Sequence, residues 1–362
     1  MARIVYGVSG EGSGHSSRAH AIGSYLVSRG HDVRMVSYDR GLKHLAADFD
    51  VFETIGLHIA NRDNKVSVLL TVAENLAKSP KMINRLFELR RSLFIEYRPD
   101  AVITDFEPMT AYLAWARGVP LISLDNQHRM RYMESPTPPG LDRDRRVSEW
   151  VIRLLVPRPN VSLATTFYFG DVKNDHTFLF PPILRDDVRA IEPSQGEHVH
   201  VYLSFGFDSF VDLLRAHTRE RFVLYGYDRD DTEGHISYRK FSREGFLRDM
   251  ATSKAIIATA GFTTLTEGLY YRKPYMTLPM DGQYEQQLNG YLMQELGYGL
   301  NAPKPEADSL VFFLNSLQDY AQSLSTYRAE DNSAIHAKLD ELLDDDCAEL
   351  KSFMRGHGAR IQ

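Results

Sequence analysis

The sequence is poor in cysteine, in long apolar runs and in excess charge of one sign. It has one cysteine, Cys347, in 362 residues, which excludes an internal disulfide and a thiolate zinc site and fits a reducing compartment. No apolar run approaches the roughly 18 residues of a transmembrane helix, and the run Ile4–Val8 is too short and too glycine-flanked for a signal peptide. We therefore expect a soluble, cytoplasmic protein.

The charge balance argues against nucleic acid as a partner. The chain has 42 Lys and Arg against 48 Asp and Glu, for a net charge of −6. A mildly acidic protein is a poor non-specific binder of nucleic acid. Hydrophobic residues make up 43% of the chain, which is ordinary for a globular protein, and the length suggests two domains with separate cores.

Short apolar runs alternate with segments of helical periodicity, which is the pattern of parallel α/β sheets. The alternation breaks at Phe180–Arg185, where two prolines precede a polar stretch, and then restarts. Two α/β domains joined near residue 182 are therefore predicted. The predicted strands are Ile4–Val8, Val33–Ser37, Ala101–Thr104, Val119–Leu124, Val161–Thr165, His198–Ser204, Phe222–Tyr225, Ala255–Ala258 and Tyr275–Leu278, and the predicted helices span 108–117, 244–251, 263–272, 283–296 and 308–323.

A glycine-rich loop, Gly10–Arg18, follows the first predicted strand and opens a helix. Glycines let the backbone approach a ligand closely, and a helix N-terminus offers free N–H groups to an anion. The spacing of Gly12 and Gly14 departs from the dinucleotide fingerprint, so a nicotinamide cofactor is not expected. His15 can project into the crevice above the sheet or can simply bond to the loop backbone.

Acidic residues end a second predicted strand, in Ile103–Pro108. This edge of a parallel sheet stands over the same crevice as the glycine loop. An aspartate behind a histidine fixes its tautomer and stabilises the imidazolium, so Asp105 is a candidate partner for His15. Alternatively, Asp105 caps the helix that follows. Asp125–His128 forms a third polar cluster on this edge.

The segment Thr259–Asn289 carries the strongest signal. A strand ends just before a glycine turn, and Thr263 and Thr264 open a helix, which suits a diphosphate. Glu267 lies one turn further on, where it can accept hydrogen bonds from a ribose diol.

Four polar side chains follow the next predicted strand, in a loop and helix. Carboxylates and amides at this density suit a polyhydroxylated ring, because each offers paired donors or acceptors. The alternative is a surface helix rich in glutamine. The four residues are Asp281, Gln283, Gln286 and Gln287.

The order of these features resembles the glycosyltransferases of the GT-B fold. The similarity is to the UDP-glycosyltransferases of plants and to the N-acetylglucosaminyltransferase that makes the peptidoglycan precursor. It also extends to a bacterial and archaeal glycosyltransferase-like family, through the Gly-Ser-Gly-His, Thr-Asp-Phe-Glu-Pro, Asp-Asn-Gln-His and Pro-Pro-Ile-Leu-Arg motifs. The positions that match the C-terminal donor signature are Gly261, Thr264, Glu267, Pro274, Pro279, Gln286 and Gln287.

The resemblance, which covers about 1–130 and 180–300, implies an α/β protein of the GT-B type. Two Rossmann-like parallel-sheet domains would face a central cleft. Residues 1–182 would form the acceptor-side domain and 183–340 the nucleotide-sugar domain. A helical tail, 341–362, would pack back toward the first domain.

The resemblance also assigns roles within the site. Gly261–Thr264 would bind the pyrophosphate and Glu267 would bind the ribose. The donor sugar would be held by Gln286 and Gln287, together with Asp281 or Gln283. Phe241 would contact the base. The first loop of the second domain lacks the Gly-Gly-Ser of the peptidoglycan enzyme, which weakens the assignment of Ser204 and Gly206. The implied binding set is Gly12, Gly14, Ser204, Gly206, Phe241, Gly261, Phe262, Thr263, Thr264, Glu267, Asp281, Gln283, Gln286 and Gln287.

The implied function is an inverting glycosyltransferase that uses a nucleotide-sugar donor, a UDP-sugar in the first instance, and needs neither metal nor cofactor. His15 would act as general base and Asp105 would orient it. The acceptor would be a small molecule, a glycan or a lipid-linked molecule. Two alternatives stay open: a nucleotide-sugar 2-epimerase and a non-catalytic nucleotide-sugar-binding subunit.

Two charged segments have competing interpretations. Lys78–Arg98 carries six basic and two acidic residues among apolar ones. It suits a helix packed on the sheet with a solvated basic face, or a peripheral contact with the inner face of a membrane. Asp228–Asp230 resembles the metal motif of the other glycosyltransferase fold, but we interpret it as a charged turn.

Overall fold

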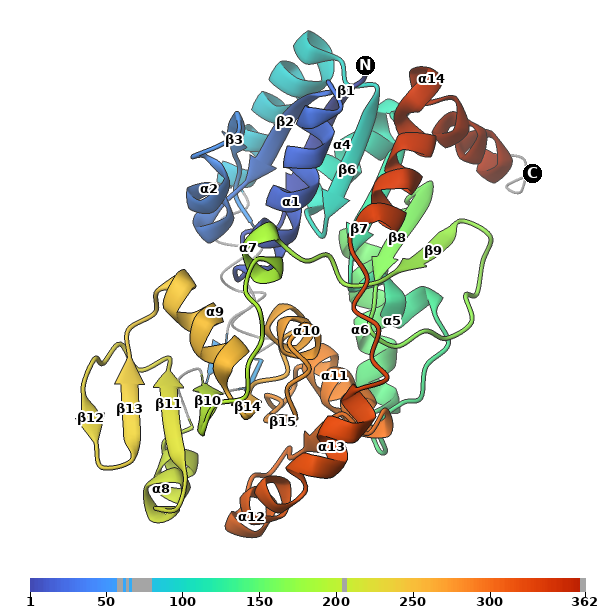
Figure 1. Cartoon of the computed structure of the whole chain (residues 1–362). Helices are drawn as coiled ribbons and strands as arrows, with labels where there is room; N and C mark the ends of the chain where they lie inside the picture. Colours follow the sequence, from blue (N-terminus) through green and yellow to red (C-terminus); the bar gives the residue numbers. More distant parts are fainter. Residues whose placement is uncertain (57–60, 63–64, 67–79, 204–206, 359–362) are drawn as a thin grey trace.

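Two seven-stranded sheets organise the chain (Figure 1). The computed structural model describes residues 1–56, 61–62, 65–66, 80–203 and 207–358. Ser204 and Gly206 of the predicted site therefore lie outside the described residues, as do residues 78–79 of the basic segment.

The first sheet has the order β3-β2-β1-β6-β7-β8-β9, and all of its strand pairs are parallel. Its central strands are buried on both faces, as expected for a sheet covered by helices. The strands are β1 (Arg3–Val8), β2 (Asp32–Ser37), β3 (Val51–Glu53), β6 (Ala101–Asp105), β7 (Leu121–Asp125), β8 (Val161–Thr165) and β9 (Thr177–Phe180). The connecting helices are α1 (Gly14–Ser28), α2 (Asp39–Leu45), the π-helical η1 (Arg90–Tyr97), α4 (Pro108–Arg117), α5 (His128–Tyr132) and α6 (Asp142–Leu155).

The second sheet has the order β12-β13-β11-β10-β14-β15-β16, in which only the pair β12–β13 is antiparallel. A linker with the short helix α7 (Asp186–Arg189) leads into it, and an antiparallel pair, β4 (Asn61–Arg62) and β5 (Lys65–Val66), lies apart from both sheets. The strands are β10 (His198–Tyr202), β11 (Arg221–Tyr225), β12 (Thr232–Glu233), β13 (Ile236–Arg239), β14 (Ala255–Ala258), β15 (Tyr275–Thr277) and β16 (Gly299–Asn301). The helices are α8 (Asp208–Ala216), α9 (Arg243–Thr252), α10 (Phe262–Tyr270), α11 (Tyr284–Glu295), α12 (Ala307–Asn315) and α13 (Leu317–Leu324).

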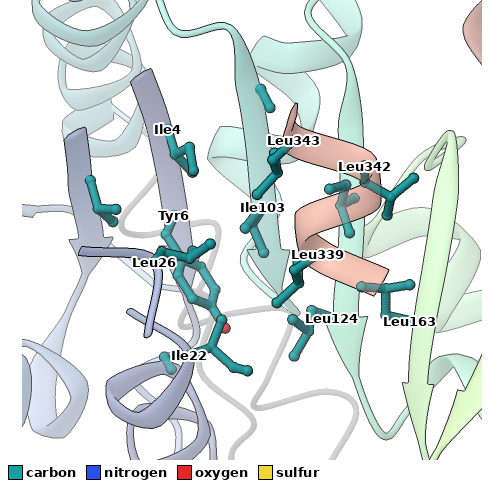
Figure 2. Close-up of a cluster of buried hydrophobic side chains, with 14 of the residues drawn as sticks. Ile4, Tyr6, Ile22, Leu26, Ile103, Leu124, Leu163, Leu339, Leu342 and Leu343 are labelled. Carbon is teal, nitrogen blue, oxygen red and sulfur yellow. The ribbon is translucent and has the colours of Figure 1, made fainter. Parts of the chain in front are cut away.

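The C-terminal helix α14 (Ser333–Gly358) returns to the first sheet (Figure 1). Its leucines, among them Leu339, Leu342 and Leu343, pack with Ile103 and Leu124 of the sheet (Figure 2). Ile335 also belongs to this contact, so the segment that packs on the first domain begins before the predicted start of the tail at residue 341. The helix is interrupted at Asp344–Cys347, which have non-helical backbone angles, with φ between +47° and +58° at the last three residues. Apolar residues on both sides of this break, such as Leu339 and Leu350, complete the core of the first domain.

The opposite face of the first sheet is covered by η1 and α4. Leu89, Leu93 and Phe94 are buried against this face together with Met109 and Leu113. The basic segment 80–98 therefore packs on the sheet through its apolar residues, as in the interpretation of this segment as a helix of the first domain.

One predicted helix is broken. The amphipathic segment 308–323 forms two helices, α12 and α13, that meet at Ser316. The Ser316 N–H bonds to the carbonyls of both Phe312 and Phe313, which closes the first helix before the second begins. Among the described residues, we find no helix with the length and apolarity needed to span a bilayer.

Candidate functional site

His15 and Asp105 meet at the carboxyl edge of the first sheet. His15 is the second residue of α1, and Asp105 ends β6, which pairs with β1 so that Val8 lies opposite Asp105. His15 Nδ1 lies 2.6 Å from Asp105 Oδ1. The Asp105 side chain is fully buried, whereas that of His15 is 14% exposed. The histidine is thus anchored from behind by a buried carboxylate and stays partly exposed.

Arg18 completes this cluster, and sequence reasoning missed it. It lies three residues after His15 on the same helix, so both face the same way. Its Nε and Nη2 each lie 2.7 Å from an oxygen of Asp105, which is a bidentate pair, and Nη2 lies 3.3 Å from His15 Nδ1. The spacing of three residues between His15 and Arg18 on a predicted helix could have indicated that the two side chains lie together.

Glu107, rather than Asp105, caps α4. Its carboxylate accepts hydrogen bonds from the backbone N–H groups of Met109, at 2.9 Å, and Thr110, at 2.8 Å. Burial raises the pKa of Glu107, although the bonds from Thr110 and Met109 act against this shift. The cap that we had considered for Asp105 is therefore supplied by its neighbour, and Asp105 is directed to His15 and Arg18.

The residues of the third polar cluster, Asp125–His128, make two kinds of contact. Asp125 accepts from the backbone N–H of His128 at 2.8 Å, and its other oxygen lies 2.7 Å from His128 Nδ1. Burial raises the pKa of Asp125, but the adjacent His128 outweighs this effect and holds the pKa below its usual value. Asn126 and Gln127 instead donate to Glu285 of the second domain at 2.7 and 3.1 Å. Glu285 is another residue that we did not predict.

The N-terminus of α10 faces the glycine loop across the domain interface. Gly261 is its N-cap and supplies no side chain to bond the first N–H groups. A Cβ on Gly14 would lie 2.5 Å from Thr263 Oγ1, so a larger residue would force the Thr263 side chain to move. The structure thus brings Gly14 and Gly261–Thr264 together. Gly12 has φ +74° and open space around it.

Glu267 lies one turn into α10 and is bonded to Arg185 of the linker. Arg185 Nη2 donates to Glu267 Oε1 at 2.9 Å, and Nη1 donates to Ser17 Oγ at 2.6 Å. Burial raises the pKa of Glu267 to about 7, although Arg185 opposes the shift. The side chain expected to hold the ribose therefore has an internal cationic partner. Arg185 ends the Pro-Pro-Ile-Leu-Arg motif, but its ion pair with Glu267 could not be foreseen from the sequence.

The glutamines of the predicted sugar site lie at the start of α11 and bond to each other and to the preceding loop. Gln286 Nε2 donates to Gln283 Oε1 at 2.7 Å, while Gln286 Oε1 accepts from the Met280 N–H at 3.1 Å. Gln287 Nε2 reaches the Met280 carbonyl at 3.5 Å. These bonds fix the amides near the domain interface. Asp281 is exposed on the same loop.

Phe241 is placed at the carboxyl edge of the second sheet. It follows β13, its side chain is 65% exposed, and its ring centroid lies 5.4 Å from that of Phe246. An exposed aromatic face at this edge can stack on a planar ring.

The two domains are closed on each other in this structure. A cavity of about 10 Å³ remains between them, lined by Gly14, Arg18, Arg185, Thr263 and Glu267 among others. That volume corresponds to about one water molecule. The contact between α1 and α10 therefore leaves no room for a larger ligand at this point of the interface.

Comparison with known proteins identifies the family. Residues 2–318 match the profile of glycosyl transferase family 1. An uncharacterized glycosyltransferase of Methanosarcina acetivorans is 23% identical over 324 residues, which span 82% of this chain and 84% of that protein.

Solved structures show the same fold over nearly the whole chain. The glycotransferase of kitacinnamycin superposes with a TM-score of 0.68 at 17% identity, covering 96% of this chain and 99% of that one. Phytolacca americana UGT2, complexed with UDP-2fluoro-glucose and pterostilbene, gives a TM-score of 0.62 at 14% identity and covers 99% of each chain. The predicted fold class is therefore confirmed, and this chain belongs to glycosyl transferase family 1 as an enzyme of the GT-B fold.

Proposed function

We propose that the enzyme transfers a sugar from a nucleotide-sugar donor, in the first instance a UDP-sugar, to an acceptor hydroxyl, with inversion and without a metal ion. The observation that carries this proposal is the 2.6 Å contact between His15 Nδ1 and Asp105 Oδ1 at the carboxyl edge of the first sheet. A histidine held in this way is suited to act as a general base.

In this proposal His15 removes the acceptor proton. The short contact with the Asp105 carboxylate favours a proton on Nδ1, so Nε2 carries the lone pair that faces the cleft. As the acceptor oxygen attacks the anomeric carbon, its proton passes to Nε2. The bond from that carbon to the diphosphate oxygen breaks, and the nucleoside diphosphate leaves with the electron pair. Asp105 stabilises the imidazolium that results.

The N-terminus of α10 would stabilise the leaving diphosphate. Its first N–H groups receive no bond from the side chain of the N-cap Gly261, and the helix dipole places partial positive charge there. Arg185 lies at the same interface and supplies a cation. These groups lower the energy of the diphosphate anion as it departs, which is the role that we assign to them in place of a metal ion.

Donor entry in this scheme requires domain opening. The cavity of about 10 Å³ cannot hold a nucleotide. The bonds from Asn126 to Glu285 and from Arg185 to Ser17 both cross the interface, so they break or rearrange when the domains part. Arg185, once released from Ser17, would then leave Glu267 free to bind the ribose hydroxyls, which is the role that we assign to it.

A donor screen tests the proposal. The enzyme is incubated with UDP-, GDP- and dTDP-sugars and candidate hydroxyl acceptors, in excess EDTA, and the products are analysed by mass spectrometry and NMR. We expect transfer with inverted anomeric configuration. An epimerised sugar without transfer would favour the 2-epimerase, binding without turnover would favour a non-catalytic subunit, and activity restored only by magnesium or manganese would contradict metal independence.

A further inference from the structure

Helix α6 exposes an apolar stripe. Val147, Trp150, Val151 and Leu154 recur at helical spacing and are between 39% and 66% exposed, whereas Ile152 on the other side is buried. A surface helix of a globular domain normally turns its apolar stripe to the core. Helix α6 instead exposes an apolar stripe to solvent, which indicates a surface that binds another molecule.

The neighbouring helix α4 continues this surface. The Tyr112 hydroxyl donates to the Leu154 carbonyl at 2.6 Å, which joins α4 to the end of α6. Trp115, one turn further along α4, is 54% exposed. A groove of about 680 Å³ opens beside them, lined by Tyr112, Trp115 and three arginines. The only two tryptophans of the chain, Trp115 and Trp150, thus lie exposed on adjoining helices.

Arginines accompany the apolar stripe. Residues 143–158 hold five arginines and two acids in a chain whose net charge is −6. Arg145 pairs with Glu149. Arg143, Arg146 and Arg153 form no ion pair with any residue that the structure describes, and all three are exposed. The groove adds Arg131 and Arg158, each of which lies over an aromatic ring of this surface.

We propose that this α4–α6 surface binds an anionic lipid bilayer. Tryptophan favours the boundary between headgroups and acyl chains, and arginines around an apolar face attract anionic headgroups. A second copy of this chain fits less well, because a two-fold interface would set the arginines of one α6 against those of the other. The proposal is independent of the donor and of the chemistry in the cleft.

This surface differs from the segment on which the sequence placed a membrane contact. Ile83 and Phe87 of that segment are exposed as well. However, its Arg85 and Arg91 pair with Glu88 and Glu96, which reduces their attraction for headgroups. Lys81, Arg90 and Arg98 of that segment form no ion pair with a described residue, so charge alone does not separate the two surfaces. The α4–α6 surface is distinguished by its two exposed tryptophans.

Intrinsic fluorescence tests the proposal directly, because both tryptophans belong to the surface. The full-length protein is mixed with vesicles of phosphatidylcholine containing about one third phosphatidylglycerol, and with vesicles of phosphatidylcholine alone. We expect a blue shift of the emission and co-sedimentation with the anionic vesicles. Binding should weaken when salt rises from about 0.1 M to about 1 M, because the Debye length falls from about 10 to 3 Å.

Variants separate this surface from others. Replacing Arg143, Arg146 and Arg153 together by glutamine should reduce partitioning by about 10²-fold, from roughly fivefold per arginine. Trp150→Gln with Leu154→Gln should reduce it by at least about tenfold. Phe312→Gln is the matched control, since Phe312 is 58% exposed on α12 of the other domain, and it should bind as the unaltered protein does.

Three results would overturn the proposal. They are absence of binding to anionic vesicles, equal and salt-independent binding to both kinds of vesicle, and loss of binding through Ile83→Gln with Phe87→Gln but not through the α6 variants. Analytical ultracentrifugation without lipid completes the test. A dimer that Trp150→Gln dissociates would show that the surface serves a second copy instead.

Discussion

Arg185 of the linker and Glu267 of α10 form an ion pair at the domain interface, with 2.9 Å between Nη2 and Oε1. Since the same guanidinium donates to Ser17 at 2.6 Å, one linker residue joins α1 of the first domain to α10 of the second. In our proposal, the donor ribose displaces Arg185 from Glu267 as it binds. The linker thus senses whether the donor site is filled.

Glu267→Ala should weaken UDP binding by about 1–3 kcal/mol, because the ribose hydroxyls lose a charged acceptor. Isothermal titration calorimetry measures the effect. Glu295→Ala, an exposed glutamate at the end of α11, is the matched control and should bind UDP normally. Unchanged affinity in folded Glu267→Ala would remove this residue from the donor site.

The same glutamate should make stability depend on pH. Its pKa rises from 4.5 to about 7 in the folded protein through burial, so the folded state holds a proton that the unfolded state has lost between these values. This contribution to stability is fully present below pH 4.5 and is lost as pH rises through about 7. Relative to Glu267→Gln, the free energy of unfolding of the unaltered protein should fall by on the order of 3 kcal/mol between pH 4.5 and 8. Urea denaturation at each pH measures it, and a constant difference would contradict the burial argument.

Arg18 should set the pH dependence of turnover. In Arg18→Gln, the buried Asp105 would have His15 as its remaining cationic partner, which favours the imidazolium. The acid limb of the kcat/KM profile should then move to higher pH. Arg18→Lys keeps the positive charge but loses the bidentate geometry. This variant should therefore lower the rate without moving the acid limb of the kcat/KM profile. Equal stability losses in both variants with no movement of the limb would indicate a purely structural role.

Helix α14 should be essential to the first domain. Leu342 is fully buried in the core cluster that α14 forms with the sheet. Leu342→Ala should therefore lower the free energy of unfolding by about 2–5 kcal/mol, through lost burial and the cavity it creates. Glu349→Ala, on the exposed face of the helix, should change it by less than about 0.5 kcal/mol. Denaturant unfolding compares the two, and similar small losses would mean that α14 adds little to the core.

Local patterns were sufficient to predict most of the sheet strands. The run Val161–Thr165 and the run Ala255–Ala258 are strands with the predicted bounds, because buried parallel strands leave continuous apolar runs between turn signals. The short edge strand β3 and the helix α6 were not predicted. Strand β3 is short and only partly buried, so its apolar pattern is weak. Helix α6 buries Ile152 but turns most of its other apolar residues to solvent.

The site was predictable where neighbouring strands place their ends together. His15 and Asp105 follow adjacent strands of one sheet, so their proximity follows from the topology. Glu285 was missed because its partners belong to the other domain. Arg185 was missed because it is a linker residue that bonds to both domains. Sequence patterns within one domain carry no information on how two domains dock.

His15 and Asp105 should behave as one unit. Asp105→Asn should lower the rate of transfer, because an amide can hold the ring but cannot stabilise its positive charge. The double variant His15→Ala with Asp105→Asn should then be little slower than His15→Ala alone. Multiplicative losses in single-turnover kinetics would separate the two residues.

The most direct test of the account is the rate of sugar transfer by His15→Ala, measured together with its affinity for UDP. We predict a rate lower by about 10²–10⁴ and an affinity close to that of the unaltered enzyme, because in our proposal His15 acts on the acceptor while α10 and α11 hold the donor. His20→Ala, on the same helix and partly exposed beside Asp48, is the matched control and should transfer normally. Near-normal transfer by His15→Ala would contradict the proposed mechanism.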